Sequence, residues 1–299
     1  MRVSYLKRAL PVYIMILPGM LFFLIFKYIP MFGIVIAFKD YNPFRGFLGS
    51  DWVGLDQFVR LFTERDFMPL LYNTLMLSLM DIIFFFPAPI IMALLLNEVR
   101  LRFFKRSVQT ILYAPHFLSW VVIVGITVVL FSTEFGGINQ LLKSMGLPVI
   151  NILTNADAFR WTWLIQNIWQ GVGWGTIIFL AALSSVDPSL YEAASIDGAS
   201  RLKQIWHVTL PALSGVIIIL FILRLGNFMD IGFEHIYLLQ NPLNQGVSDV
   251  FDTYVYRQGI VQGDFSYSTA VGIFKSIVGL VLIIGANTIV KRAGQEGVY

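Results

Sequence analysis

Long apolar runs separated by short polar segments dominate the hydropathy pattern of the chain. Each run is long enough for a membrane-spanning helix, which needs about 20 mostly apolar residues. We expect six such helices, at residues 12–37, 71–96, 108–131, 161–183, 209–231 and 269–290. The first run follows Arg2, Lys7 and Arg8, as in a signal peptide. No small-residue cleavage site follows it and the run is too long, so we interpret it as an uncleaved first helix.

The composition points the same way. Hydrophobic residues make up 57% of the 299 residues, charged residues only 13%, and the mean hydropathy is +0.73. A soluble domain with so little charge would expose too much apolar surface. The sequence therefore predicts an all-α integral membrane protein with one domain over residues 1–299. It contains no cysteine, which excludes disulfides, thiol catalysis and cysteine–zinc sites.

The distribution of basic residues predicts the orientation in the membrane. Eleven Lys and Arg residues lie in four of the polar segments: 1–11, 97–107, 184–208 and 291–299. Seven lie in the three alternate, longer segments: 38–70, 132–160 and 232–268. Because basic residues are enriched in cytoplasmic loops, both termini are expected in the cytoplasm, together with the loop 184–208. The same rule explains the net charge of +3 and the basic cluster within 97–107 better than nucleic-acid or lipid binding does.

The loop 184–208 carries the most informative motif. It reads Glu-Ala-Ala at 192–194, three residues, Gly198, nine residues, then Val-Thr-Leu-Pro at 208–211. These residue types predict two short helical pieces with a hinge at Gly198, the second ending at Pro211 in the first turn of the next helix. The small residues Ala193 and Ala194 would let another protein approach closely. The acids Glu192 and Asp197 lie beside them.

This spacing resembles the EAA loop of membrane permeases in binding-protein-dependent ABC importers, with Val208 where that family usually has Ile. Six spans with this loop between the fourth and fifth are similar to the type I importer (MetI-like) fold. The resemblance implies ATPase coupling by Glu192, Ala193, Ala194 and Gly198, and we include Asp197 with them. The alternative is an ordinary amphipathic loop helix that begins with a favourable acid.

The resemblance also implies partners. Two homologous permeases would form a pore, two cytoplasmic ATPase subunits would each receive one loop in a groove, and an extracellular lipoprotein would deliver the solute. No catalytic residue, metal site or cofactor is expected in this chain, with ATP and Mg bound by the partner ATPase. The chain lacks the glycine-rich phosphate-binding loop that nucleotide hydrolysis would require.

Three further segments, at 86–89, 113–120 and 232–239, resemble carbohydrate-uptake permeases. They are similar to the oligo- and polysaccharide-importing subgroup of Gram-positive bacteria, nearest to permeases for pectin-derived (rhamnogalacturonan) oligosaccharides. We therefore expect a multi-pass permease of the cell membrane that moves oligosaccharides, including uronate-containing pectin fragments. The alternatives are an ABC permease for another sugar or a peptide, a secondary transporter, or an intramembrane enzyme. No internal repeat or convergent catalytic set is visible to support the last two.

A candidate substrate path lies in the fifth span. Arg224, Asn227, Asp230 and Glu234 recur at three- and four-residue steps, which predicts one shared helix face. A charged residue inside a span costs about 2.5–3.5 kcal/mol on insertion scales, so Arg224 needs water, a ligand or a partner. Two interpretations stay open. Arg224 contacts sugar hydroxyls and uronate carboxylates, for which its fork is suited, or it forms an internal ion pair with Asp230 or Glu234.

The fourth span contains tryptophans and glycines close together in the sequence: Trp169, Gly171, Gly173, Trp174 and Gly175. Counted back from Glu192, Gly171 and Trp174 match positions where the resembling maltose-type permease has a sugar-contacting glycine and aromatic residue. The alternative is tight helix packing by the glycines and an interfacial belt of tryptophans. Two lysines within spans, Lys27 and Lys275, would either neutralise an acid or reach the interface.

The three histidines, His116, His207 and His235, are isolated from one another in the sequence. We expect interfacial or packing roles for them. No spacing of His or carboxylate residues is typical of a metal site.

Overall fold

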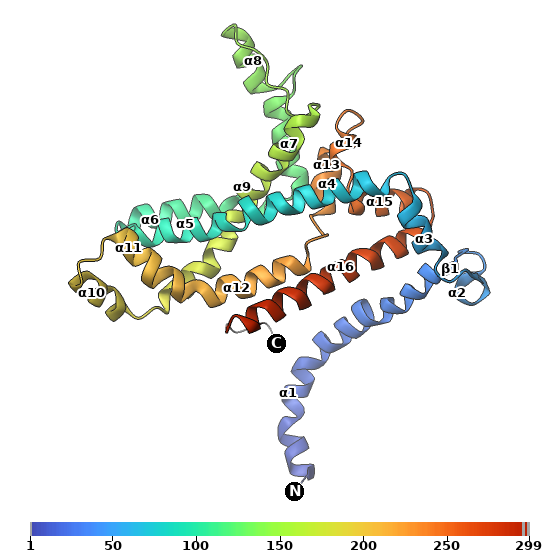
Figure 1. Cartoon of the computed structure of the whole chain (residues 1–299), viewed down its shortest axis with the longest axis horizontal. Coiled ribbons are helices and arrows are strands. Elements are labelled where there is room, and N and C mark those ends of the chain that lie inside the picture. The colour runs from blue at the N-terminus through green and yellow to red at the C-terminus, as the bar shows by residue number, and fades with distance from the viewer. Residues whose placement is uncertain (1, 295–296, 298–299) are drawn as a thin grey trace. The chain divides into compact units, whose positions relative to one another are not determined.

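The computed structural model describes residues 2–294 and 297 of the chain, most of which are helical (Figure 1). Residues 1, 295–296 and 298–299, at the two ends predicted to be cytoplasmic, lie outside the described residues. The chain separates into two compact units, one of Met1–Arg65 with Val255–Phe274 and one of Asp66–Tyr254 with Lys275–Tyr299. Each unit is described by itself below.

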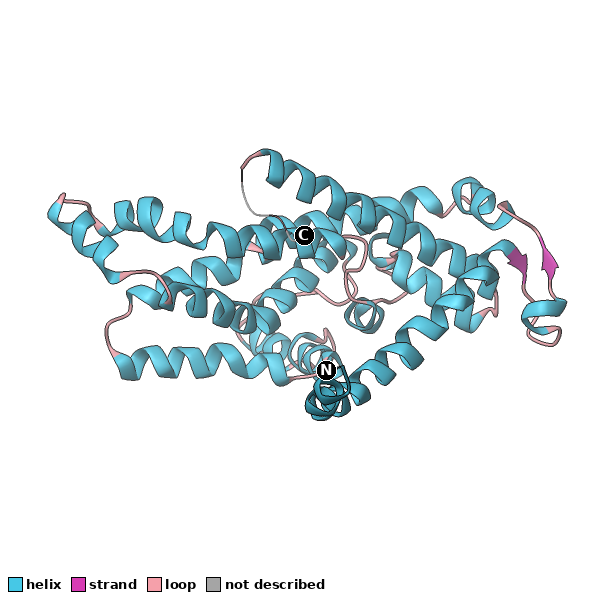
Figure 2. Ribbon diagram, turned by 90° about the horizontal axis from the view of Figure 1, so that it is seen from below, coloured by secondary structure: helices cyan, strands magenta, loops and turns pink. Residues whose placement is uncertain are grey.

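The first unit begins with a long helical segment and continues into a small hairpin. In chain order its elements are α1 (Arg2–Phe23), the π-helical turn η1 (Leu24–Tyr28), the 3-10 helix η2 (Ile29–Phe38), β1 (Lys39–Asp40), α2 (Gly46–Gly49), β2 (Asp51–Trp52), α3 (Asp56–Thr63), the π-helical turn η6 (Arg257–Val261) and the start of α16 (Phe265–Arg292). The two strands pair antiparallel, Lys39 with Trp52 and Asp40 with Asp51, as Figure 2 shows in magenta.

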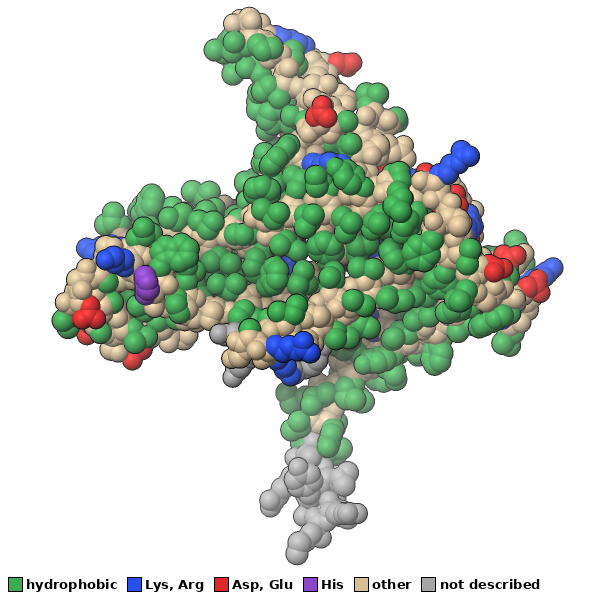
Figure 3. All heavy atoms as spheres, viewed as in Figure 1, with side chains coloured by type: hydrophobic (Ala, Val, Ile, Leu, Met, Phe, Trp, Pro, Cys, Tyr) green, Lys and Arg blue, Asp and Glu red, His purple; other side chains and the backbone are tan. Residues whose placement is uncertain are grey.

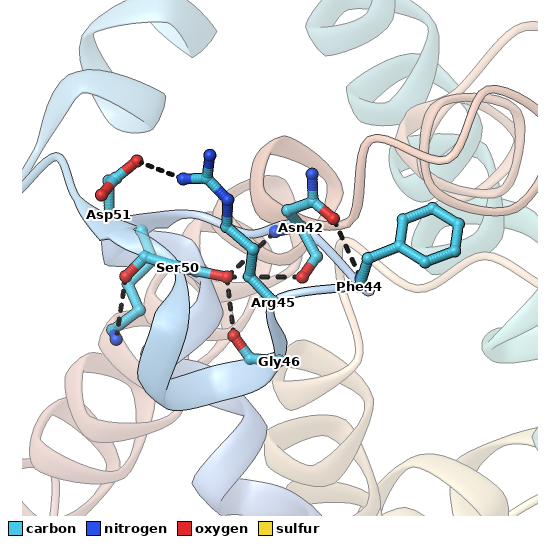
Figure 4. Close-up of polar contacts among 7 residues, drawn as sticks. Asn42, Phe44, Arg45, Gly46, Ser50 and Asp51 are labelled. Carbon is cyan, nitrogen blue, oxygen red and sulfur yellow. Dashed lines mark hydrogen bonds and ion pairs between the residues drawn. The ribbon is translucent and has the colours of Figure 1, made fainter.

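The loop between the strands is closed by its own side chains (Figure 4). The Ser50 hydroxyl donates to the Gly46 carbonyl at 2.7 Å and accepts from the Asn42 amide at 3.0 Å. The Asn42 side chain accepts from the Phe44 amide at 2.9 Å, a local turn that asparagine favours. In the same unit Arg60 pairs with Asp264 at 2.6 Å, which joins α3 to the residues just before α16. These contacts give the segment after η2 a defined conformation.

The second unit holds most of the helices. Its elements are α4 (Phe67–Met80), the π-helical turn η3 (Asp81–Phe85), α5 (Pro87–Glu98), α6 (Arg102–Tyr113), the 3-10 turn η4 (Ala114–Phe117), α7 (Trp120–Phe131), α8 (Gly137–Ser144), α9 (Ala156–Ser184), α10 (Pro188–Ile196), α11 (Arg201–Gln204), the π-helical turn η5 (Ile205–Thr209), α12 (Leu210–Gly226), α13 (Phe233–Leu239), α14 (Gln245–Ser248), α15 (Phe251–Tyr256) and the rest of α16. Figure 1 shows α4 and α5 as consecutive parts of one long rod.

Among the described residues, four helical segments are long and apolar enough to cross a membrane: Leu10–Phe38, Phe67–Glu98, Arg201–Gly226 and Phe265–Arg292. Two bent pairs bring the number to six if each pair is one span: Arg102–Phe117 with Trp120–Phe131, and Ala156–Ser184 with Pro188–Ile196. Hydrophobic side chains cover much of the visible face of these helices (Figure 3). The prediction of an all-α protein with six spans is therefore confirmed.

The third predicted span, 108–131, is not one helix. Its two parts meet at a bend of 102° between Phe117 and Trp120. Pro115 lies at the start of η4 and cannot donate to a preceding carbonyl. Ser119 then caps α7, its hydroxyl accepting from the Val122 amide at 3.5 Å. The elbow lies inside the segment 113–120, whose residues carried part of the sugar-permease resemblance.

The fifth predicted span, 209–231, ends early, at Gly226. Gly226 and Gly279 lie where α12 crosses α16, since a Cβ on Gly279 would lie 2.5 Å from the Gly226 carbonyl oxygen. Asn227 caps the helix, its amide donating to the Arg224 carbonyl. The chain then turns, and Gly232 takes a left-handed conformation with φ of 91° before α13 begins.

Three prolines explain three of the π-helical turns. In η1, η3 and η5 the residue directly before a proline donates to the carbonyl five positions back: Ile29 to Leu24, Phe86 to Asp81 and Leu210 to Ile205. Pro30, Pro87 and Pro211 follow these residues. A proline ring clashes with the carbonyl four residues earlier in an α-helix, and widening the preceding turn lets the helix continue. The helices therefore pass these prolines without ending.

Two hydrophobic clusters form the core of the second unit. One consists of Leu77, Met80, Val124, Phe159, Trp163, Leu164, Ile236, Leu239 and Val250. The other consists of Ile90, Ala93, Phe179, Leu183 and Leu213. Helix α9 contributes to both, so it is the central helix of this unit. It holds the fourth-span residues and leads into the loop 184–208.

Candidate functional site

The coupling loop, residues 184–208, begins with a capped helix. The Asp187 carboxylate accepts a hydrogen bond from the Ser189 amide at 2.9 Å, and Pro188 occupies the first helical position of α10. This bond lowers the pKa of Asp187 below its ordinary value. At the other end, the Ala199 amide donates to the Ala194 carbonyl and the Gly198 amide to the Ser195 carbonyl. That pattern needs a left-handed residue, and Gly198 has φ of +74°.

The predicted hinge is therefore correct, but the second helical piece does not end at Pro211. The helix runs without a break from Arg201 through η5 to Gly226, because the π-helical turn accommodates the proline. Two contacts fold the first piece back onto it. The Gln204 amide donates to the Ser195 hydroxyl at 2.9 Å, and the Tyr191 and Thr209 hydroxyls lie 3.1 Å apart. These contacts join α10 to α11 and η5, which continue into α12.

A groove of about 530 Å³ opens beside this loop. It is lined by Asn97, Glu98, Tyr191, Glu192, Ser195, Ile196, Arg201 and Gln204. Arg201 pairs with Glu98 at 2.6 Å, which joins the loop to the end of α5. Glu192, Ala193 and Asp197 are exposed, and the Ile196 side chain is 86% exposed. Of the predicted coupling residues, Glu192 lines the groove together with Ile196. Ala193, Asp197 and Gly198 are exposed without lining it, and Ala194 is half-buried.

Arg224 has a partner that the sequence interpretation did not name. Its Nε donates to Asp81 Oδ2 at 2.5 Å, and its Nη2 donates to Asp81 Oδ1. The pair forms across 143 positions and is neither of the two expected ones, Asp230 or Glu234. Asp81 is the first residue of η3, and its side chain is only 7% exposed, whereas that of Arg224 is 40% exposed. The internal ion pair exists, and part of the Arg224 side chain stays exposed.

The guanidinium is supported from a second side. It lies 5.0 Å from the centre of the Phe85 ring, at the other end of η3. A Cβ on Gly171 would lie 2.8 Å from the same ring, so the absence of a side chain at Gly171 leaves room for Phe85. Gly171 thereby allows the Phe85 ring to lie against Arg224. The small cavity beside Arg224, about 10 Å³, has room for about one water molecule.

The predicted shared face of Arg224, Asn227, Asp230 and Glu234 is wrong, because α12 ends at Gly226 and the last of them lies in α13. Three of the four nevertheless come together. Arg224, Asn227 and Asp230 line the same cavity as Asp81, through the turn that follows α12. Ser78, one turn before Asp81, donates to the Phe228 carbonyl and holds that turn in place. Glu234 is exposed in the first turn of α13 and is outside this group.

The fourth-span residues divide into packing and exposed positions. Gly173 and Gly175 are packing residues: a Cβ on Gly173 would lie 2.0 Å from the Leu112 carbonyl oxygen, and one on Gly175 would lie 2.8 Å from Pro89. Trp174 is 51% exposed and stacks on His116, with ring centres 4.6 Å apart and 6° between the planes. The elbow at 113–120 thus covers one face of Trp174.

His235, which lies outside the predicted spans, belongs to a buried network. Its Nε2 donates to Gln166 Oε1 at 2.6 Å, and Gln166 Nε2 donates to the Thr127 hydroxyl at 2.6 Å. The His235 ring stacks on Trp120, with centres 3.7 Å apart. Burial lowers the pKa of His235 to about 3. The network joins α13, α9 and α7 through a neutral imidazole, so the expected packing role is confirmed for this histidine.

A second buried ion pair joins Lys275 of α16 to Asp252 of α15, and each side chain is 14% exposed. Burial raises the pKa of Asp252 above its ordinary value, and the Lys275 ammonium opposes that shift. Of the two roles left open for Lys275, neutralisation of an acid is thus the one observed. No group of three or more His, Cys, Asp or Glu residues in the described part of the chain is placed to hold a metal ion.

Sequence reasoning missed Asp81, Phe85 and Glu98. One signal for Asp81 was available, since an acid within an apolar span is costly and needs a partner. Asp81 is the acid in the run 71–96, and Arg224 is the base in the run 209–231. Nothing in the sequence places Phe85 or Glu98 beside their partners.

Comparisons with known proteins show the family of the chain. The family described as "Binding-protein-dependent transport system inner membrane component" matches residues 85–295. The chain is 56% identical over 287 residues to the polygalacturonan/rhamnogalacturonan transport system permease protein YteP of Bacillus subtilis, covering 96% of this chain and 89% of that one. It is 32% identical over 288 residues to the arabinooligosaccharides transport system permease protein AraP of the same species, covering 93% and 87%.

A solved structure is similar over nearly the whole chain. It is a chain from the crystal structure of a bacterial alginate ABC transporter in complex with an alginate pentasaccharide-bound periplasmic protein. The sequences are 39% identical, 99% of each chain is covered, and the TM-score is 0.89. The predicted fold is therefore confirmed.

Proposed function

Since this chain belongs to the family of inner membrane components of binding-protein-dependent transport systems, we propose that the solute it carries is an acidic oligosaccharide. The observation that carries this proposal is the partly exposed side chain of Arg224 beside Asn227. An arginine fork matches the geometry of a uronate carboxylate. The names of two relatives support it, because polygalacturonan and alginate are acidic polysaccharides. A neutral oligosaccharide, as named for AraP, is the second candidate.

Trp174 supplies contact that does not depend on charge. His116 covers one face of its ring, and half of the side chain stays exposed. Sugars stack their apolar C–H faces on aromatic rings, so we infer that Trp174 packs against a sugar unit. The proposed substrate path thus combines an aromatic ring for stacking, Trp174, with a cationic group, Arg224.

The remaining parts of the importer are inferred from the family and the coupling loop. A second homologous permease completes the pore, and an extracellular solute-binding lipoprotein delivers the oligosaccharide. Two ATPase subunits bind ATP and Mg and hydrolyse the nucleotide, while this chain holds no cofactor. We assign the groove beside Glu192 and Ile196 to one ATPase subunit. Its movement reaches α12 through the Tyr191–Thr209 and Gln204–Ser195 contacts.

The experiment compares uptake of an acidic and a neutral oligosaccharide of equal length in proteoliposomes that contain the full importer. A hydrogen bond to a charged group is worth about 1.5–3 kcal/mol, so Arg224→Gln should lower uptake of the acidic sugar about ten- to a hundred-fold relative to the neutral one. Trp174→Ala should lower both alike. Equal losses of the two sugars in Arg224→Gln would contradict the acidic-substrate proposal.

Two controls separate this proposal from the other function classes. The purified permease without ATPase subunits should transport nothing, whereas a secondary transporter would work alone. The orientation is tested by single cysteines, because the chain has none of its own. A cysteine at Ile196 should react only with a reagent that reaches the cytoplasm, and one at Gln140, exposed after the start of α8, from outside intact cells. The reverse pattern would overturn the orientation.

A further inference from the structure

The contact between Asp81 and Arg224 uses one defined edge of the guanidinium. An arginine has five N–H donors, and Asp81 occupies the Nε donor and one Nη2 donor. The three remaining N–H groups, two on Nη1 and one on Nη2, have no hydrogen-bond partner among the described residues. Phe85 covers one face of the group. The outer edge, formed by Nη1 and Nη2, is thus the part still open to a ligand.

The burial of the two partners is unequal, and this distinguishes the pair from the Lys275–Asp252 pair. Asp81 is 7% exposed and Arg224 is 40% exposed. In the Lys275–Asp252 pair of the same unit, both side chains are 14% exposed. Asp81 binds one edge of the guanidinium, and part of the Arg224 side chain stays accessible.

A carboxylate already bound to arginine changes what the arginine offers to a second carboxylate. Asp81 compensates much of the positive charge of Arg224 and occupies the Nε–Nη2 edge of its guanidinium. A uronate would therefore meet a weaker positive charge, at the Nη1–Nη2 edge. Asp230 lines the same cavity and adds a further negative charge. A transport path requires binding that is favourable enough for entry and weak enough for release. An uncompensated arginine in this place would hold an acidic sugar too tightly.

From this geometry we propose that Asp81 is a specificity-determining residue: it orients Arg224 and weakens its hold on uronates so that acidic oligosaccharides pass rather than remain bound. The proposal rests on the proposed contact between Arg224 and a uronate. Asp81 itself touches no substrate and acts through Arg224. Its predicted effect is opposite for binding and for turnover, which a purely structural role would not produce.

The test uses the assembled importer in nanodiscs and proteoliposomes, with trigalacturonate as the acidic probe and galactotriose as the neutral one. Asp81→Asn keeps the shape of the side chain and removes its charge. We expect trigalacturonate to dissociate about ten-fold more slowly and to be taken up correspondingly more slowly. Galactotriose should be unchanged in both measurements. All rates are normalised to permease recovered with its ATPase subunits.

Three variants make the result decisive. Asp81→Glu keeps the negative charge and should restore the ratio of acidic to neutral uptake. Asp252→Asn breaks the other buried ion pair and should lower the yield of assembled importer while leaving the ratio unchanged. Asp81→Ser removes the charge with a smaller side chain, and it replaces Asp81→Asn if that variant does not assemble.

Equal changes for both sugars in Asp81→Asn, or no change for either, would overturn the proposed role of Asp81. The variant Arg224→Gln separates the two levels of the argument. If Arg224→Gln leaves the ratio unchanged, the uronate contact itself fails and the role of Asp81 fails with it. If Arg224→Gln lowers acidic uptake selectively while Asp81→Asn alters nothing, only the role of Asp81 is wrong.

Discussion

Within the coupling loop, Gln204–Ser195 and Tyr191–Thr209 join residues 9 and 18 positions apart, while Arg201–Glu98 ties the loop to α5 across 103 positions. The Arg224 site joins residues across 143 positions, from η3 to the end of α12. The loop also leaves its key side chains exposed, whereas the acid of the Arg224 site is nearly buried. The hinge and cap of the loop are therefore set by neighbouring residues, and the Arg224 site is a product of helix packing.

This difference predicts different consequences of mutation. Substitution of an exposed loop residue that makes no internal hydrogen bond, such as Glu192, should leave the permease folded while the proposed coupling to an ATPase is lost. Substitutions among the packed helices should lower the stability of the permease first and its transport as a result. Folded yield and transport rate, measured together, distinguish the two.

The largest effect on transport is expected for Glu192→Lys. Glu192 is exposed and lines the groove that we assign to an ATPase subunit, and the substitution reverses its charge there. Like charges at a partly desolvated contact repel, so co-purification of ATPase and uptake should both fall to background. The permease should remain in the membrane at its normal level.

Glu134→Lys provides the matched control. It reverses an equally exposed acid, between α7 and α8, and should leave ATPase binding unchanged. Normal recovery of ATPase by the Glu192→Lys variant would remove the basis for assigning the groove to that subunit.

The second prediction concerns the packed glycines. Gly173→Ala places a methyl group 2.0 Å from the Leu112 carbonyl oxygen, which belongs to the backbone and cannot rotate away. Overpacking of this kind costs about 1–3 kcal/mol, and α6 and α9 must separate to relieve it. The thermal midpoint of the purified permease should fall accordingly, as measured by intrinsic fluorescence.

Gly215→Ala is the control for this substitution. Gly215 lies within α12, and a Cβ there meets no atom within 4 Å. Replacing a helical glycine by alanine should leave stability equal or slightly higher. A similar loss for both variants would mean that the α6–α9 contact is not the cause.

The third prediction uses the pH dependence of stability. His235 has a folded pKa of about 3 against an ordinary value of 6.5. Above pH 6.5 the ring is neutral in both folded and unfolded chains. Below it the unfolded chain binds a proton that the folded chain does not, so stability is lost as pH falls from 6.5 toward 3. At pH 5 the loss from this group is about 2 kcal/mol.

His235→Gln should therefore flatten the fall in thermal midpoint between pH 7 and pH 5, whatever its effect at pH 7. His207→Gln, at an exposed histidine whose Nδ1 donates to the Lys203 carbonyl, should leave the slope as in the wild type. An unchanged slope in His235→Gln would exclude the buried imidazole as the source of the acid sensitivity.

These regions also explain what the sequence could predict. The apolar runs predict six spans, and the spacing around Gly198 predicts the hinge, because both signals are contained in neighbouring residues. The bend after Phe117 and the end of α12 were missed because the apolar runs continue past them. The end of α12 lies at the crossing of Gly226 with Gly279. No local sequence pattern encodes that crossing. The partner of Arg224 was missed for the same reason, although the cost of two opposite charges inside apolar spans pointed to such a pair.

The smallest predicted effect lies within the coupling loop, where Asp187 caps α10. Asp187→Ala removes the acceptor for the Ser189 amide, so the first turn of the helix should fray. Hydrogen exchange at residues 189–191 should speed up a few-fold, while Asp187→Asn, which can still accept the bond, should stay close to the wild type.

The lowered pKa of Asp187 gives a second measurement. Its stabilisation is present above the ordinary carboxyl pKa near 3.8 and is lost as pH falls through the lower folded value. Exchange in the wild type should thus approach that of Asp187→Ala only in strong acid. Transport should change little, because the internal contacts from Tyr191 and Ser195 still hold α10 in place, and a large transport defect would show that the cap itself contacts the ATPase.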